Sequence, residues 1–118
     1  MSPISQEPLS IEDVESSASQ RILRLNGPVL MDNLWDFQAK VRANTSKALI
    51  LDMTGVPYID SAGIGALVGA YVTHQKEGRS LALVGVTDRV LGSLKATRVD
   101  QFFRLFGSLD EAKRAMSA

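Results

Sequence analysis

Two short, continuous apolar runs separated by a helical pattern constrain the fold of this chain most strongly. Residues 48–51 (ALIL) and 81–84 (LALV) contain no polar side chain, which is typical of strands buried on both faces of a sheet. Between them, a helical stripe begins at Ser61 and ends before Gly78, a stop signal. The stripe consists of Ile64, Leu67, Val68, Tyr71 and Val72. A strand–helix–strand unit of this kind predicts a crossover connection and a parallel strand pair.

The segment before this unit predicts two strands and a helix. Residues 11–18 are a weak strand candidate, and residues 21–25 are a better one that ends at the turn Asn26-Gly27-Pro28. A helix is expected between Met31 and Asn44, with Asp32 or Asn33 able to cap its start. The apolar face of this helix would consist of Leu34, Phe37 and Val41.

The segment after this unit predicts a helix, a strand and a last helix. Thr87 or Asp88 can cap a helix that carries Val90, Leu91 and Leu94, and residues 101–106 form a short final strand. Ser108 and Glu111 have capping-box spacing ahead of the last helix. We therefore predict an α/β fold with a mostly parallel central sheet, an antiparallel N-terminal hairpin and about four flanking helices. Residues 1–10 are expected to be a flexible leader, and residues 11–118 a single domain.

Composition excludes several classes of function. The 118 residues contain no cysteine, so disulfides, thiolate catalysis and cysteine metal sites are ruled out together. Thirteen basic residues balance thirteen acidic ones, which argues against a nucleic-acid partner. No run approaches the ~20 apolar residues that a membrane span needs, so membrane insertion is not expected. The N-terminus is polar and acidic and does not resemble a secretory signal, which favours a cytoplasmic location.

An enzymatic function is not supported by the residues present. The only histidine, His74, lies 13 positions after Ser61 on the same predicted helix, so the two would be ~20 Å apart rather than in hydrogen-bond contact. We expect His74 to face solvent, and no metal site or cofactor is predicted. Gly63, Gly65 and Gly69 do not form a dinucleotide-binding fingerprint, because Val68 occupies the position of its third glycine. A weak nucleotide site of another design stays open.

The stretch YIDSAGIG, residues 58–65, is the main functional candidate. Asp52 and Asp60 flank the loop that begins at Thr54, and Ser61 begins the next helix. All three would lie at the carboxyl edge of the sheet, where ligands and partners dock in open α/β folds. Asp and Ser are also preferred helix caps, so the bare motif on its own favours capping alone.

The longer stretch LILDMTGVPYIDSAGIG, residues 49–65, resembles the central signature of the STAS domain of bacterial anti-sigma factor antagonists. Members of that family show an apolar strand, then Asp-[Leu/Met]-[Ser/Thr]-Gly-Val, an aromatic–aliphatic pair, and Asp-Ser-[Ser/Thr/Ala]-Gly-[Leu/Ile]-Gly. The resemblance extends over roughly residues 20–116. It implies the STAS fold and a non-enzymatic function.

The resemblance also implies a phosphorylation switch at Ser61, the serine after the motif aspartate. In the family, the unphosphorylated antagonist binds an anti-sigma factor serine kinase and frees the sigma factor. Phosphorylation by that kinase blocks binding, and a PP2C-type phosphatase restores it. Carried over to this chain, the partner-binding residues are Asp52, Thr54, Gly55, Tyr58, Asp60, Ser61, Ala62, Gly63, Ile64, Gly65 and Thr87.

One departure from the family pattern leaves an alternative open. Family antagonists usually carry Gly-Glu-[Ile/Leu]-Asp after the second strand, where this chain has Gly27-Pro28-Val29-Leu30. The acid is missing unless Asp32 or Asn33 substitutes for it. The alternative is a constitutive STAS scaffold or regulatory subunit of a transporter, for example a lipid-transport ABC system. Ala62 leaves Ser61 as the sole hydroxyl acceptor in the motif.

Overall fold

The structure is a computed structural model that describes residues 8–117. The predicted leader lies mainly outside these residues, and Ser10 already belongs to the first strand. The elements in chain order are β1 (Ser10–Ser16), β2 (Gln20–Asn26), α1 (Trp35–Arg42), β3 (Ala48–Gly55), α2 (Ser61–Lys76), β4 (Ser80–Val84), α3 (Asp88–Ala96), a 3₁₀ helix (Asp100–Phe102), β5 (Arg104–Phe106) and α4 (Leu109–Ala115).

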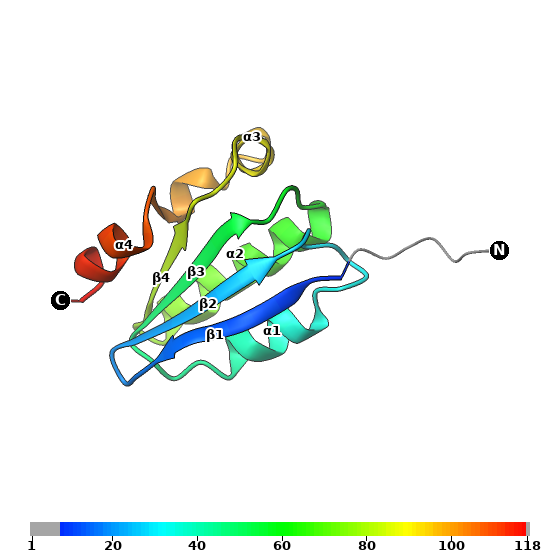
Figure 1. The fold of residues 1–118 in the computed structure, drawn as a ribbon. Coiled ribbons are helices and arrows are strands. Elements are labelled where there is room, and N and C mark those ends of the chain that lie inside the picture. Colours follow the sequence, from blue (N-terminus) through cyan, green and yellow to red (C-terminus); the bar gives the residue numbers. More distant parts are fainter. Residues whose placement is uncertain (1–7, 118) are drawn as a thin grey trace.

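The five strands form one sheet in the order β1-β2-β3-β4-β5 (Figure 1). β1 and β2 pair antiparallel, and each later pair is parallel, so the predicted fold class is confirmed. The weak strand candidate at residues 11–18 is real and forms one edge of the sheet. Its pairing with β2 shifts register between Asp13 and Glu15. Each parallel connection returns the chain over a face of the sheet and starts its helix at the carboxyl edge.

Two apolar layers cover the two faces of the sheet. The helices α1 and α2 lie behind the sheet in Figure 1 and, with α3, pack on one face. The core on that face includes Leu23, Leu25, Phe37, Leu49, Leu51, Met53, Leu67, Leu83, Val90 and Leu94. The helix α4 covers the opposite face. The smaller core there consists of Ile22, Ala48, Ile50, Ala82, Val84, Ala112 and Met116.

The first helix begins later than predicted. α1 starts at Trp35, and its N-cap residue Leu34 makes no side-chain cap. Asn33 instead stabilises the preceding turn: its Oδ1 accepts from the amide of Leu30 (2.9 Å), and its Nδ2 donates to the carbonyl of Pro28 (2.9 Å). Asparagine side chains commonly bond nearby backbone groups in this way. Asn33, a candidate cap in the sequence, therefore stabilises the turn and does not cap α1.

The predicted final strand over residues 101–106 is also shorter. Its first two residues belong to the 3₁₀ helix, and only Arg104–Phe106 pairs with β4. Aromatic packing accounts for the difference. The ring of Phe102 stacks on Tyr71 with the ring centroids 5.5 Å apart, and Phe103 meets Tyr71 edge-on at 6.0 Å.

The prediction for His74 is wrong. His74 is 2% exposed, whereas Val72, which was assigned to the apolar stripe, is 42% exposed. The face of α2 that turns to the sheet consists of Gly63, Ala66, Leu67, Ala70 and His74, which recur at helical spacing. Small side chains bring α2 close to the sheet. His74 is tolerated there because its Nδ1 bonds the carbonyl of Ala70 (2.8 Å) and its Nε2 bonds Nδ2 of Asn44 (3.0 Å).

Candidate functional site

Asp60, not Ser61, caps the helix α2. Its backbone is extended, and its Oδ1 accepts from the amide of Gly63 at 2.8 Å. Its Oδ2 accepts from the amide of Met31 at 3.0 Å, in the loop between β2 and α1. One carboxylate therefore joins two connections at the carboxyl edge of the sheet. An isolated parallel bridge between Val29 and Ile59 fixes the same two loops together.

Ser61 is the first residue of α2 and is exposed. Within residues 8–117 its hydroxyl makes no hydrogen bond, because Asp60 performs the capping. The backbone amides of Ser61 and Ala62 are likewise without a hydrogen-bond acceptor among the described residues. Amides at a helix N-terminus favour negative charge nearby. The hydroxyl is thus accessible and sits where an added anion can be accommodated.

Gly63 is required by close packing of the first turn of α2. A Cβ at this position would overlap the carbonyl oxygen of Val29 and approach Ile59. Gly65 and Gly69 differ, because a Cβ at either would meet open space. The three glycines therefore have different roles: the first packs against a loop, and the other two lie where the helix surface is open.

The loop between β4 and α3 also reaches this site. It contains Thr87 and meets the loop that contains Tyr58. Thr87 caps α3 by accepting from the amide of Val90 (3.3 Å), and its hydroxyl donates to the carbonyl of Val56 (3.4 Å). The guanidinium of Arg89 lies 4.7 Å from the centroid of the Tyr58 ring. These contacts place the start of α3 beside the loop that precedes Ser61.

Asp52 is not brought together with Asp60 and Ser61. Leu51 and Met53 belong to the core beneath α1 and α2, so the side chain of Asp52 between them faces the opposite side of the sheet. There it accepts from Nε of Arg24 (3.2 Å), from the Thr54 hydroxyl (2.7 Å) and from the Thr54 amide (3.1 Å). Arg24 also pairs with Glu12 of β1 at 3.4 Å. In the structure, Asp52 and Thr54 thus join strands at the end of the sheet.

Asp52 should make the stability of the fold depend on pH in the acid range. Burial would raise the pKa of this carboxyl, but the hydrogen bonds from Thr54 and Arg24 outweigh burial and hold the pKa below its usual value. A lowered folded-state pKa stabilises the fold above the unfolded pKa of about 4, and this contribution is lost as pH falls through the folded value. We expect Asp52→Asn to lower the thermal midpoint at pH 7, with a smaller difference from wild type at pH 3.

Thermal unfolding of both proteins from pH 7 to pH 3 measures this difference. Glu12→Gln is the matched control, because Glu12 contacts the same arginine from an exposed position and should have little effect. A difference between Asp52→Asn and wild type that stays constant down to pH 3 would contradict the assignment.

The family model of the STAS domain matches residues 11–112. This chain belongs to the STAS domain family. Among curated proteins, it is 32% identical over 57 residues to the anti-sigma-B factor antagonist of Listeria monocytogenes, which is 48% of this chain and 50% of the relative. The chain thus aligns with about half the length of the curated relatives it matches.

Solved structures agree with this fold. An anti-sigma factor antagonist from Mycobacterium paratuberculosis superposes with a TM-score of 0.79 at 21% identity, covering 100% of both chains. The murine Solute Carrier 26 family member A9 anion transporter contains a similar region, with a TM-score of 0.74 and 28% identity. That match covers 86% of this chain and 18% of the transporter. STAS domains of this shape therefore occur both in antagonists and inside transporters.

Within residues 8–117 of this STAS domain, no helix is long and apolar enough to cross a membrane. The same residues contain no group of three or more His, Asp or Glu side chains placed to hold a metal ion.

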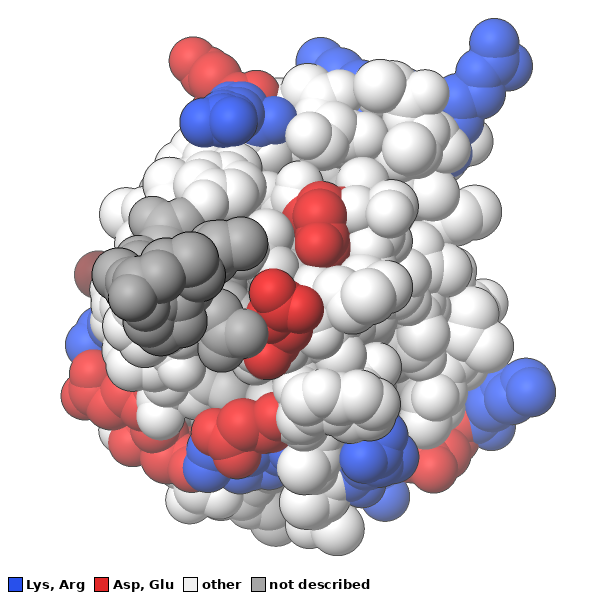
Figure 2. All heavy atoms as spheres, turned by 90° about the vertical axis from the view of Figure 1, so that its right-hand side faces the viewer, with Lys and Arg blue, Asp and Glu red and all other residues white. Residues whose placement is uncertain are grey.

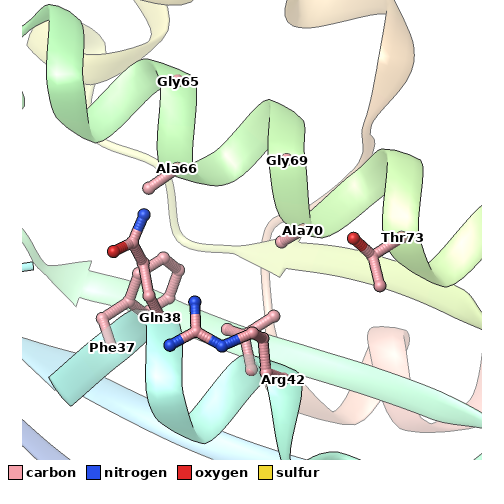
Figure 3. Close-up of a pocket in the computed structure, with 9 residues that line it drawn as sticks. Phe37, Gln38, Arg42, Gly65, Ala66, Gly69, Ala70 and Thr73 are labelled. Carbon is pink, nitrogen blue, oxygen red and sulfur yellow. The ribbon is translucent and has the colours of Figure 1, made fainter. Parts of the chain in front are cut away.

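A shallow groove runs between α1 and α2 of the STAS domain (Figure 3). Gly65 and Gly69 lie on successive turns of α2 above it, and Gln38 points from α1 toward α2. Phe37 and Val41 line the groove from the α1 side. The groove exists because the two glycines lack side chains that would fill it.

Sequence reasoning missed two exposed residues at the edge of the STAS domain that carries Ser61. Met31 is 65% exposed and Trp35 is 70% exposed, the highest values for large apolar side chains among residues 8–117. Figure 2 views this edge and shows a largely uncharged centre interrupted by acidic side chains, with basic groups toward the rim. The signal in the sequence was a tryptophan directly beside the apolar stripe of the first helix rather than on it.

Proposed function

We propose that this STAS domain is an anti-sigma factor antagonist controlled by phosphorylation of Ser61. In its unphosphorylated form it binds an anti-sigma factor serine kinase in the cytoplasm and causes release of the sigma factor. The kinase transfers phosphate to Ser61 and thereby ends binding, and a PP2C-type phosphatase reverses the modification. The observation that carries the proposal is the exposed Ser61 hydroxyl at the first position of a helix that Asp60 already caps.

The location of Ser61 allows the domain to respond without unfolding. A phosphoryl group adds about −1.5 to −2 charge at pH 7. The free amides at the start of α2 and the helix dipole favour that charge in the unbound domain. In a docked interface beside Asp60, the same charge meets repulsion and loses its water. A difference of about 1.4 kcal/mol between the two states already changes affinity tenfold.

The docking surface consists of the segments that converge around Ser61. It includes the start of α2 from Asp60 to Gly65, with Ala62, Gly63 and Ile64. The preceding loop contributes Gly55 and Tyr58, and the start of α3 contributes Thr87, which is tied to that loop. We retain Asp52 and Thr54 in this proposal only as residues that hold the end of β3, because their side chains bond each other and Arg24.

Phosphorylation and binding can be tested together. Incubation of the chain with its cognate kinase, ATP and Mg²⁺ should add one phosphate at Ser61 by mass spectrometry, and none to Ser61→Ala. Ser61→Asp should weaken kinase binding by about tenfold or more in calorimetry, because a negative charge enters the docked surface. Its thermal midpoint should stay close to that of wild type, since Ser61 is exposed and does not cap the helix.

Thr73→Asp is a suitable control, because Thr73 is an exposed hydroxyl residue near the other end of the same helix. It should leave kinase binding unchanged. Phosphate on a residue other than Ser61, or full binding by Ser61→Asp, would overturn the proposed switch.

A second candidate function is a constitutive STAS scaffold in a transporter. The observation in its favour is the 28% identity to the region within an anion transporter. The absence of the family acid in the turn at Leu30 agrees with it, because residues 27–30 of this chain carry no carboxylate. Co-purification with a transport ATPase, unaffected by Ser61→Ala, would favour the scaffold over the switch.

A further inference from the structure

Met31 and Trp35 form a candidate apolar contact surface beside Ser61. Six large apolar side chains are exposed by more than a third among the described residues, and these two are the most exposed, at 65% and 70%. They are four positions apart at the entry to α1, whereas the others are scattered over β1, α2, the 3₁₀ helix and β5. Burial of Leu34 and Phe37 toward the core leaves Trp35 directed away from it.

Backbone geometry places this surface at the proposed switch. The amide of Met31 donates to Oδ2 of Asp60, the residue directly before Ser61. α1 and α2 both follow parallel strands, so both begin at the carboxyl edge of the sheet. The entry to α1 and the phosphoacceptor are therefore neighbours in space although they are 30 positions apart in the sequence.

We propose that Met31 and Trp35 are the apolar anchor by which this domain docks to its partner protein. This inference rests on the proposed function and adds two residues, outside the docking surface defined around Ser61, that supply affinity. The partner is a protein with an apolar pocket for Trp35 and basic side chains around it. Tryptophan, with its large area and few rotatable bonds, is the residue type most often found at such energetic centres.

Charge around the anchor supports a partner of this chemistry. Asp32 and Asp36 are exposed and adjoin Met31 and Trp35 in the chain, and no hydrogen bond or ion pair engages either carboxylate among residues 8–117. Figure 2 shows acidic groups within an otherwise uncharged area on this edge. By contrast, both oxygens of Asp60 are taken by backbone amides. Asp32 and Asp36 are thus available to pair with basic residues at the rim of the partner's pocket.

The anchor also explains why a phosphate would prevent docking. A phosphoserine on Ser61 that enters the interface must lose water and is repelled by the neighbouring Asp60 carboxylate, whereas at a solvated helix N-terminus it is stabilised. Because Met31 adjoins Asp60, a phosphate on Ser61 lies at the border of the apolar surface. Docking would bury it, and the unbound state is favoured.

The sole tryptophan of the chain is Trp35, so its fluorescence reports directly on docking. The wild-type chain is titrated with the purified anti-sigma factor kinase from the same cell. The kinase is loaded with ADP, and any Trp in the kinase is replaced by Phe so that the emission comes from Trp35. The inference predicts a blue shift of the emission and a marked fall in acrylamide quenching. Trp35→Ala should weaken binding by about 30-fold or more in calorimetry, the scale of an interface hot spot. Val72→Ala, a change at an exposed apolar site on α2, should bind as wild type does.

The outcomes separate this inference from the proposed function. If the kinase binds and Ser61→Asp blocks binding, but Trp35 stays fully quenchable and Trp35→Ala binds normally, the anchor is wrong while the switch stands. If the kinase does not bind the wild-type chain, both are wrong. An unchanged thermal midpoint for Trp35→Ala excludes loss of folding as the cause of weaker binding.

Discussion

Replacing Gly63 with valine is expected to lower the free energy of unfolding by about 2 kcal/mol or more. The new Cβ would overlap the carbonyl oxygen of Val29, which is backbone held by its bridge to Ile59. To relieve the overlap, α2 must move away from the loop between β2 and α1. That movement would also stretch the two hydrogen bonds of Asp60.

Gly69→Ala is the matched control for this change. A Cβ at Gly69 meets open space in the groove between α1 and α2, so the helix gains propensity without a clash. We expect Gly69→Ala to raise the free energy of unfolding by about 0.5–1 kcal/mol. Urea unfolding of both variants measures the two effects. Equal stabilisation by both substitutions would show that the first turn of α2 is not closely packed.

His74→Ala is expected to cost about 3 kcal/mol of stability, although the sequence suggested a solvent-facing residue. The imidazole is buried, and its removal leaves a cavity between α2 and the loop before β3. It also leaves Nδ2 of Asn44 with one hydrogen bond instead of two, since that nitrogen bonds both the ring and the carbonyl of Ser46. A buried donor that loses its partner adds to the cost of the cavity.

Gln75→Ala tests whether this effect is specific to the buried position. Gln75 follows His74 on the same helix and is exposed, so its replacement should change stability by no more than about 0.5 kcal/mol. Urea unfolding provides the measurement. A loss below about 1 kcal/mol for His74→Ala would contradict the network with Asn44 and Ala70.

Much of the fold was predictable because burial on both faces leaves a simple pattern. The apolar runs in β3 and β4 have few polar interruptions, and their separation by one helix specifies a parallel pair. His74 was mispredicted because its immediate neighbours are polar, while the helical spacing from Leu67 and Ala70 places it on the buried face. The position along the helix decided its environment, not the residue type.

The site was predictable in its centre and less so in its surroundings. The motif located Ser61 and Asp60 at a helix start, and the structure places them there. Side chains alternate between the two faces of a sheet along each strand. Because Leu51 and Met53 lie in the core beneath α1 and α2, Asp52 between them must face the other side of the sheet. Met31 and Trp35 were missed because periodic patterns identify buried positions, and an exposed contact surface has no period.

The irregular pairing of β1 limits how this domain can meet other proteins. A regular, uncharged edge strand offers its free backbone groups to another strand, and many proteins associate by extending a sheet in this way. Here the register shifts between Asp13 and Glu15, and both of these residues and Glu12 carry negative charge along the edge. A further strand would meet a distorted and charged edge. Association by sheet extension is therefore disfavoured at β1, which agrees with the proposal that partners dock at the helix starts and loops of the carboxyl edge, beside Ser61.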